Sequence, residues 1–197
     1  AGASQAGHLV LAVITQEQVV IEPTSVSYQQ GDTIRTALKN SGHSFEGIDT
    51  GFVSAIDGTA DNYTLFYDQG GYDLDAAADT VTVVCFTSYQ DQYSPQYLNL
   101  LSVMAAYNDS PNGVQSYATA QNAYDAARKA LYGATASQAE TLAADLRQAM
   151  DDYEAYLSGK TVPVTLEITQ GQERLNAVNA TFTGEFGNVT TVEQDTT

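Results

Sequence analysis

Aromatic residues gather near one turn in the middle of the sequence, and they are the residues best suited to contact a ligand. Tyrosine combines a large apolar ring with a hydroxyl group, so a cluster of tyrosines suits a binding surface. Strand alternation places Tyr63 and Tyr67 on one side and Phe66 on the other, which predicts that half of the cluster is core. The candidate ligand-binding residues are therefore Tyr63, Tyr67 and Tyr72.

Acidic residues share the same stretch, and cation binding is the chemistry to consider first. They are Asp57, Asp61, Asp68, Asp73, Asp75 and Asp79. A calcium ion needs several oxygen atoms at one point, and the spacing of Asp57, Asp61 and Asn62 does not match an EF-hand loop. We therefore expect these aspartates to form turns and to keep the surface soluble, and we expect no metal site.

Nucleophilic catalysis finds little support among the remaining reactive residues. The histidines are His8 and His43; Ser41 and Ser44 lie beside His43 in sequence, but sequence adjacency does not make a catalytic triad. The single cysteine, Cys85, lies in a strand-like run and is expected to be a buried, inert thiol. We expect no catalytic residues and no cofactor. A glycan hydrolase remains a weaker alternative, because carboxylates are plentiful although no pair of them stands out.

The composition limits the partners of the chain. Its 197 residues carry a formal net charge of −17, and 43% of them are hydrophobic, which is typical of a globular protein. Such an acidic surface repels phosphate backbones, so nucleic-acid binding is excluded. No apolar run approaches the roughly 18 residues of a membrane span. The acidic, lysine-poor composition favours an extracellular or cell-wall location of the Gram-positive type.

Residues 1–88 alternate strand-like and helix-like patterns. Ile34, Ala37 and Leu38 form one apolar stripe at helical spacing, and Asp57-Gly58 marks a tight turn. The expected strands are 9–21 (one long strand or a hairpin), 25–28, 52–56, 63–67 and 80–88. This pattern predicts an α+β domain with a small mixed sheet and one helix.

Residues 89–159 carry helical periodicity. Ser94-Pro95 is a typical helix start, Ser137 to Glu140 fits a capping box, and Gly159 is a typical helix stop. The three apolar stripes comprise Tyr97, Leu100, Met104 and Tyr107, then Tyr117, Ala120, Tyr124, Ala127 and Leu131, then Ala139, Leu142, Leu146, Ala149, Tyr153 and Tyr156. Short links between the stripes predict an antiparallel three-helix bundle.

Residues 160–197 return to strand patterning. Val164, Leu166 and Ile168 alternate with polar residues, and residues 179–182 form another strand-like run. Because two or three strands are marginal by themselves, this β segment either pairs with the first sheet or begins a domain of a longer protein. We favour the second interpretation, in which the segment is the start of a truncated surface repeat with neighbouring domains.

Part of the first domain resembles the transcobalamin C-terminal-like β-grasp modules of bacterial surface proteins. The matching positions are Gly31, Thr33, Ala37, Leu38, Gly51, Val53, Ile56, Asp57 and Gly58. The resemblance covers roughly residues 9–87, and it implies a β-grasp fold and a corrinoid-like ligand.

Residues 114–157 resemble a FIVAR-type helical module of wall proteins. The matching features are Tyr117, Ala120, Ala127, Leu131, the Ala134-Thr135 link, Gln138, Leu142, Leu146 and Ala149. The tail from Val162 is similar to the opening strands of a prealbumin-like surface repeat. That similarity raises the hypothesis of an isopeptide crosslink from Lys160 to an asparagine, with Asn176, Asn179 and Asn188 as candidates.

These features together predict a non-catalytic segment of a secreted or cell-wall-associated bacterial surface protein. A β domain would bind or display, a helical module would act as a spacer, and the partner would be a surface ligand, a glycan or a protein. The alternative is a small-ligand (corrinoid-like) binding protein.

Overall fold

A computed structural model describes residues 6–67, 73–88, 94–159, 178–182 and 189–193, and the side chains at 6–65, 73–88 and 94–159. The chain separates into two compact units, 1–147 and 148–197, and each is described by itself. The first unit contains two sheets and most of the helices. The molecule is a mixed α+β structure, as the sequence predicts.

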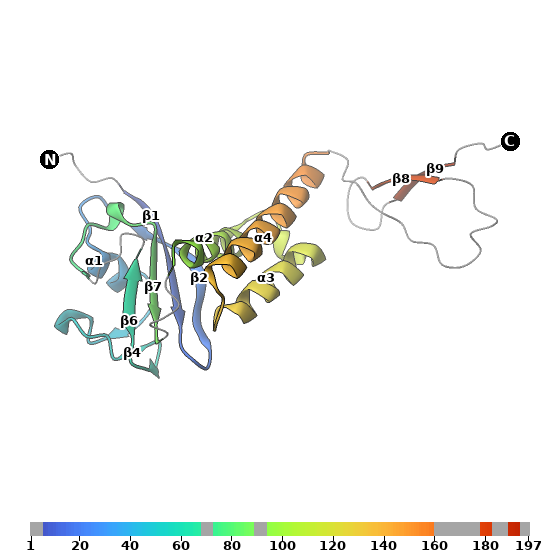
Figure 1. Cartoon of the computed structure of the whole chain (residues 1–197). Coiled ribbons are helices and arrows are strands. Elements are labelled where there is room, and N and C mark those ends of the chain that lie inside the picture. The colour runs from blue at the N-terminus through green and yellow to red at the C-terminus, as the bar shows by residue number, and fades with distance from the viewer. Residues whose placement is uncertain (1–5, 68–72, 89–93, 160–177, 183–188, 194–197) are drawn as a thin grey trace. The chain divides into compact units, whose positions relative to one another are not determined.

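The main sheet has four strands in the order β2-β1-β7-β6 (Figure 1). Strands β1 (Gly7–Ile14) and β2 (Val19–Tyr28) form an antiparallel hairpin, which decides the interpretation of residues 9–21 in favour of a hairpin. Strand β7 (Val83–Thr87) pairs parallel to β1, and β6 (Thr64–Tyr67) pairs antiparallel to β7. The sheet is therefore mixed.

A second, three-stranded sheet is made of β3 (Phe45–Glu46), β4 (Ala55–Ile56) and β5 (Thr59–Ala60). Asp57 and Gly58 join β4 to β5 with φ angles of 47° and 82°, the left-handed backbone that a tight hairpin turn requires. The predicted turn is confirmed. The predicted strand over 52–56 is too long, because residues 47–52 belong to a loop.

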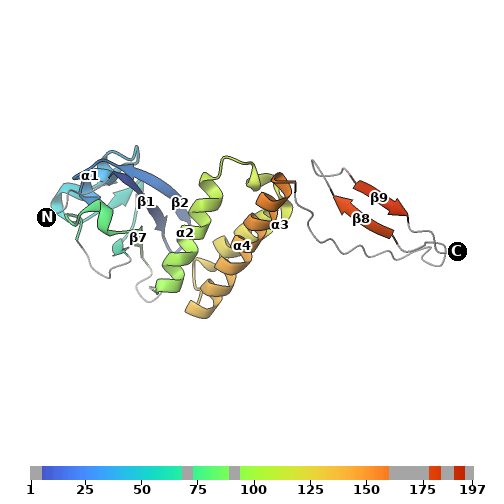
Figure 2. The same ribbon diagram turned by 90° about the horizontal axis from the view of Figure 1, so that it is seen from above.

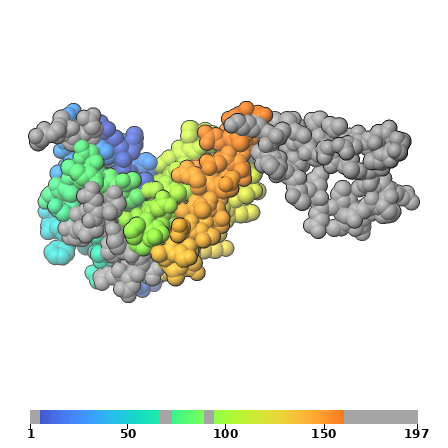
Figure 3. Space-filling view, turned by 45° about the horizontal axis from the view of Figure 1, so that its top comes forward, coloured from blue at the N-terminus to red at the C-terminus, as the bar shows by residue number. Residues whose placement is uncertain are grey.

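The main sheet is buried on both faces. One face carries Leu9, Leu11, Val13, Val84 and Phe86, which form a core with helix α1 (Ile34–Lys39). Strand alternation directs Ala12, Ile14 and Cys85 to the opposite face, where they are at most 1% exposed. Helix α2 (Pro95–Asp109) covers that face through contacts with β1, β2 and β7, and Figure 2 shows it beside these strands. In the space-filling view its bright green atoms lie on the surface of the first unit (Figure 3).

The helices begin where capping chemistry allows. The Ser94 hydroxyl accepts a hydrogen bond from the Tyr97 amide at 3.0 Å, and Pro95 occupies the first turn of α2, as predicted. Helix α3 spans Ala118–Ala130 and α4 spans Ala136–Leu157. Short 3₁₀ turns occupy Ile48–Thr50 (η1), Ala78–Thr80 (η2) and Val114–Ser116 (η4).

The capping box of α4 lies two residues earlier than predicted. The Thr135 hydroxyl accepts from the Gln138 amide at 3.1 Å, and the Gln138 side chain accepts from the Thr135 amide at 2.9 Å. Because α4 begins at Ala136, Ser137 already lies within its first turn. The predicted box from Ser137 to Glu140 is therefore wrong.

A polar seam joins helices α2 and α3 to strand β2. Its side chains are Glu22, Asn108, Asp109, Tyr124 and Arg128. The Glu22 carboxylate accepts from the Tyr124 hydroxyl at 2.9 Å and from Arg128 Nε at 2.8 Å. Asn108 Nδ2 donates both to the Tyr124 hydroxyl and to the Pro23 carbonyl at 2.8 Å. These bonds fix the helices against the sheet within the first unit.

The second unit contains the end of α4 and a separate hairpin. The rings of Tyr153 and Tyr156 stack with their centroids 6.2 Å apart, and Gly159 has φ +75°, as expected of a helix stop. Strands β8 (Val178–Phe182) and β9 (Val189–Glu193) pair antiparallel, in agreement with the strand predicted at 179–182.

Several predictions about the tail lie outside the described residues. They concern the strand at 164–168 and the positions of Lys160, Asn176 and Asn188. The crosslink hypothesis and the domain boundaries 1–88, 89–159 and 160–197 stay predictions.

Candidate functional site

Tyr63 is anchored by its own hairpin. Its hydroxyl donates to the Thr59 carbonyl at 2.8 Å, and its ring meets Phe86 edge-on with the centroids 6.5 Å apart. Burial, with smaller contributions from the Asp61 and Asp57 charges, raises the pKa of Tyr63 to about 12. The hydroxyl therefore stays protonated at neutral pH and serves the packing of β5 on the core.

The other two predicted binding tyrosines lie partly or wholly outside the described residues. Tyr67 ends β6, where its backbone pairs with Val84, but its side chain lies outside the described part of the chain. Tyr72 lies outside it entirely. A tyrosine surface made of Tyr63, Tyr67 and Tyr72 stays a prediction.

The aspartates between 57 and 79 hold turns and ion pairs. Asp73 accepts from the Asp75 amide at 2.9 Å, and Asp61 accepts from the Asn62 amide at 2.7 Å. Asp75 pairs with Arg35 at 3.1 Å. Asp68 lies outside the described residues, and within them no group of three or more His, Cys, Asp or Glu side chains could bind a metal ion.

His43 and Asp57 form a half-exposed pair at the turn between β4 and β5. His43 Nδ1 lies 2.7 Å from Asp57 Oδ2, and Asp57 Oδ1 accepts from the Ser44 amide at 2.8 Å. Burial acts to raise the pKa of Asp57, but the Ser44 and His43 hydrogen bonds outweigh it and hold that pKa below its usual value.

Ser41, which lies beside His43 in sequence, uses its hydroxyl for backbone hydrogen bonds. The Ser41 hydroxyl donates to the Leu38 carbonyl at 2.5 Å and accepts from the His43 amide at 3.3 Å. That hydroxyl is therefore used to end α1. The His43–Asp57 pair joins the residues before β3 to the turn between β4 and β5.

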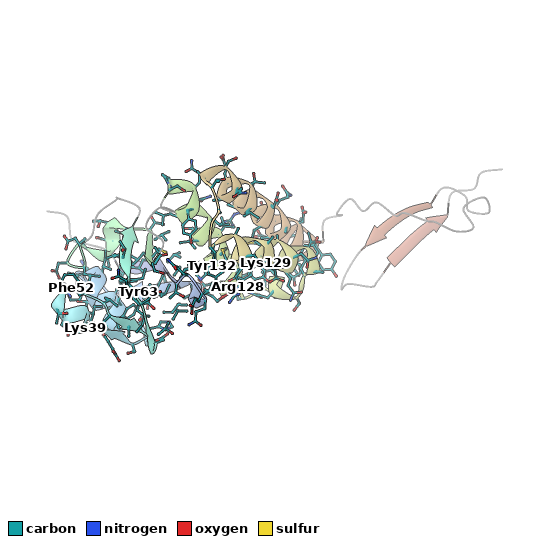
Figure 4. The ribbon with its side chains drawn as sticks, turned by 60° about the horizontal axis from the view of Figure 1, so that its bottom comes forward. Lys39, Phe52, Tyr63, Arg128, Lys129 and Tyr132 are labelled. Atoms are coloured by element: carbon teal, nitrogen blue, oxygen red, sulfur yellow. The ribbon has the colours of Figure 1, made fainter. Side chains whose placement is uncertain are left out.

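Phe52 is the feature that the sequence analysis missed. Its side chain is 80% exposed, while its neighbour Val53 is buried. Within the first unit, it lies on the same side as Lys39 and away from the helix that carries Arg128 (Figure 4). Because adjacent residues of an extended chain point to opposite sides, burying Val53 turns Phe52 outward. The adjacent apolar residues Phe52 and Val53 were the feature of the sequence that indicated that one of the two would face outward.

The loop of residues 47–52, called the Phe52 loop, is tightly braced. Gly47 and Gly51 both adopt left-handed φ angles, 83° and 88°, around η1. The Thr50 amide and hydroxyl donate to the Gly47 carbonyl at 3.0 and 2.7 Å. A Cβ on Gly47 would lie 2.2 Å from the Phe52 carbonyl oxygen, so this close approach of two backbone segments depends on glycine.

Helix α1 supports the same loop from beneath. Arg35 Nη1 donates to the Ile48 carbonyl while its Nε donates to Asp75. Lys39 Nζ donates to Asp49 at 2.9 Å. Buried Ile48 anchors the loop in the core. Phe52 is therefore presented by a fixed backbone.

A hollow of about 700 Å³ opens between α3 and the first turns of α4. Its lining consists of Ala126, Lys129, Ala130, Tyr132, Gly133, Ala134, Ser137, Gln138, Thr141 and Leu142. Lys129 and Tyr132, labelled in Figure 4, are its large lining residues besides Gln138 and Leu142, and the other six are Ala, Gly, Ser or Thr. Its volume suits a small molecule, although it is open to solvent.

Within the described part of the chain, no helix is both long enough and apolar enough to cross a membrane. No protein-family model, no curated protein and no solved structure matches the chain, so its function is argued from its own residues.

Proposed function

We propose that the chain is a non-catalytic binding and display segment of a secreted or cell-wall-associated bacterial surface protein. The observation that carries this proposal is the exposed aromatic side chain of Phe52 on a braced loop. An aromatic anchor on a fixed backbone loses little conformational entropy on binding, which is the property of a binding hot spot.

The strand order supports a β-grasp interpretation of the first domain. A β1–β2 hairpin is followed by α1, and the last strand, β7, returns to pair parallel with β1. We propose that residues 1–88 bind as a transcobalamin-like module and that residues 89–159 act as a FIVAR-like spacer. The polar seam supports a rigid junction between these parts. In this proposal the tail begins a further repeat.

Surface labelling tests the proposed location. Antibodies raised against the purified chain should label intact cells of the source organism, and protease added to intact cells should remove that signal. A cytosolic enzyme of the same cells is the control, because it must stay protected until lysis. Signal that appears only after lysis would sink the proposal of a surface role.

A small-ligand function is the second candidate, and the hollow between α3 and α4 favours it. Its volume of about 700 Å³ is of the size that small-molecule sites occupy. Titration with a panel of corrinoids, followed by absorbance, tests the ligand that the family resemblance implies. A spectral shift that disappears when Thr141→Tyr fills the hollow supports binding there, a shift that survives this variant places the ligand on residues 9–87, which carry the resemblance, and absence of any shift removes the corrinoid form of the candidate.

A further inference from the structure

The surface around Phe52 combines one apolar anchor with an excess of negative charge. We define the Phe52 surface as Phe52 together with Lys39, Glu46 and Asp49. All four side chains are exposed, and the Phe52 loop connects the strands that carry Glu46 and Ala55. The anchor alone could bind any apolar pocket, so the charges decide the kind of partner.

The cations near the loop are already neutralised. Lys39 pairs with Asp49 at 2.9 Å, and Arg35 pairs with Asp75 at 3.1 Å. Arg35 also lies in the field of Asp49 and Asp73. Glu46 has no ion pair with any other described residue. Counting Lys39, Glu46 and Asp49, the Phe52 surface carries a net charge of −1, of the same sign as the whole chain at −17.

We infer that the partner of the Phe52 surface is a peptide segment that combines apolar side chains with lysine or arginine side chains. This inference rests on the proposed binding function and names the chemistry of its partner. Burying a Phe side chain contributes roughly 1.5–3 kcal/mol, which gives affinity without selecting a partner. Charge complementarity supplies the selection and speeds encounter at low ionic strength.

Other occupants fit the surface less well. Two copies of this chain repel each other through their net charge of −17 each, which disfavours self-association through this surface. A neutral glycan stacks on an aromatic ring and its hydroxyl groups can donate to carboxylates, but it brings no positive charge to complement the negative charge of this surface. A basic partner uses both features at once.

Selection from a random peptide library displayed on phage tests the inference. The purified full chain is the target, and selection is carried out at low salt. The selected peptides should combine Lys or Arg with Leu, Ile or Phe. Their affinity, measured by calorimetry, should fall about tenfold in Phe52→Ser and should weaken as NaCl rises from about 20 to about 200 mM.

The chain offers a matched control. Among the described side chains, Leu157 is the other large hydrophobic one that stands exposed, at 50%. Leu157→Ser removes comparable apolar surface elsewhere and should leave peptide affinity unchanged. Glu46→Lys keeps Phe52 but reduces the negative charge beside it, so it should weaken the basic peptides. Urea unfolding of Phe52→Ser should match the parent, because the ring is exposed.

Three results would overturn the inference. They are selected peptides that are neutral or acidic, affinity that survives Phe52→Ser, and sedimentation showing that the chain self-associates through Phe52. Each result is independent of surface labelling, so a wrong partner chemistry and a wrong cellular location are distinguished.

Discussion

Gly47 is the residue on which the shape of the Phe52 loop depends. Its φ angle of +83° suits glycine, and the space that a side chain would need is occupied by the Phe52 carbonyl. Gly51, in the same loop, has φ +88° but nothing within 4 Å of a Cβ at its position. Comparing substitutions at the two glycines therefore separates the energetic cost of a left-handed backbone from the cost of a steric clash.

Gly47→Ala should destabilise the chain more than Gly51→Ala. A left-handed alanine costs roughly 1–2 kcal/mol, which is the whole effect expected for Gly51→Ala. Gly47→Ala adds the displacement of backbone by its Cβ, so its free energy of unfolding should fall by at least about 1 kcal/mol more. Urea unfolding of both variants measures the difference, and equal losses would contradict the close approach.

Asp57 gives the chain a defined response to acid. Its pKa in the folded state lies below the value of about 3.9 expected in the unfolded chain, so its contribution to stability is present above that pH. The contribution is lost as pH falls through the folded pKa. Asp57→Asn tolerates the left-handed backbone, and its unfolding free energy should decline less between about pH 5 and pH 3. Identical pH slopes for parent and variant would refute this role.

At the scale of elements, two alanine variants test which residue caps the start of α4. Thr135→Ala removes the side chain that accepts from the Gln138 amide and should cost about 0.5–2 kcal/mol. Ser137→Ala changes a residue inside the first turn and should stay within about 0.5 kcal/mol. Thermal unfolding of the two variants decides between them, and a larger loss for Ser137→Ala would restore the sequence-based box.

The elements predicted well are those whose signals are local. Ser94 and Pro95 specify a helix start by themselves, Asp57-Gly58 specifies a hairpin turn, and the Ile34, Ala37 and Leu38 stripe is buried in α1. Each needs only neighbours a few residues away. Such features are accessible without knowing the tertiary structure.

The elements predicted poorly depend on distant partners. The parallel pairing of β1 with β7 joins residues over seventy positions apart, such as Val10 and Val83. Cys85 is buried, as predicted, but the contacts of α2 with β1 and β7 that cover its face of the sheet join distant elements and were not predicted. Alternation along the chain places Phe52 and Val53 on opposite sides, but which of the two is buried depends on how η1 packs on α1, so the candidate binding surface was not predicted.

At the scale of the first unit, the sheet and helices share one buried interior. Helix α2 covers the face that carries Ala12, Ile14 and Cys85, so residues 1–88 alone would expose that face to water. Cys85 is a convenient reporter because it is the single cysteine of the chain. Burial raises its pKa to about 12, which keeps the thiolate scarce at neutral pH.

A fragment of residues 1–88 should therefore react with the thiol reagent DTNB faster than the chain ending at 159. We expect at least about a tenfold higher rate for the fragment at pH 8, because both the thiolate fraction and access increase on exposure. The same two proteins in concentrated urea are the control and should react equally. Equal protection of Cys85 in the two folded proteins would show that α2 is dispensable for this face.

The residues at the end of α2 also affect how strand β2 can associate with other chains. Strand β2 is the outermost strand of its sheet, and an outermost strand offers unpaired backbone groups on which another chain can add and start a fibre. Asn108 bonds the Pro23 carbonyl and Asp109 accepts from the Ser25 amide, so side chains already occupy those positions. Pro23 itself offers no amide hydrogen. The residues that join helix to sheet thereby block strand addition in the middle of β2, which protects crowded copies from associating through that part of the edge.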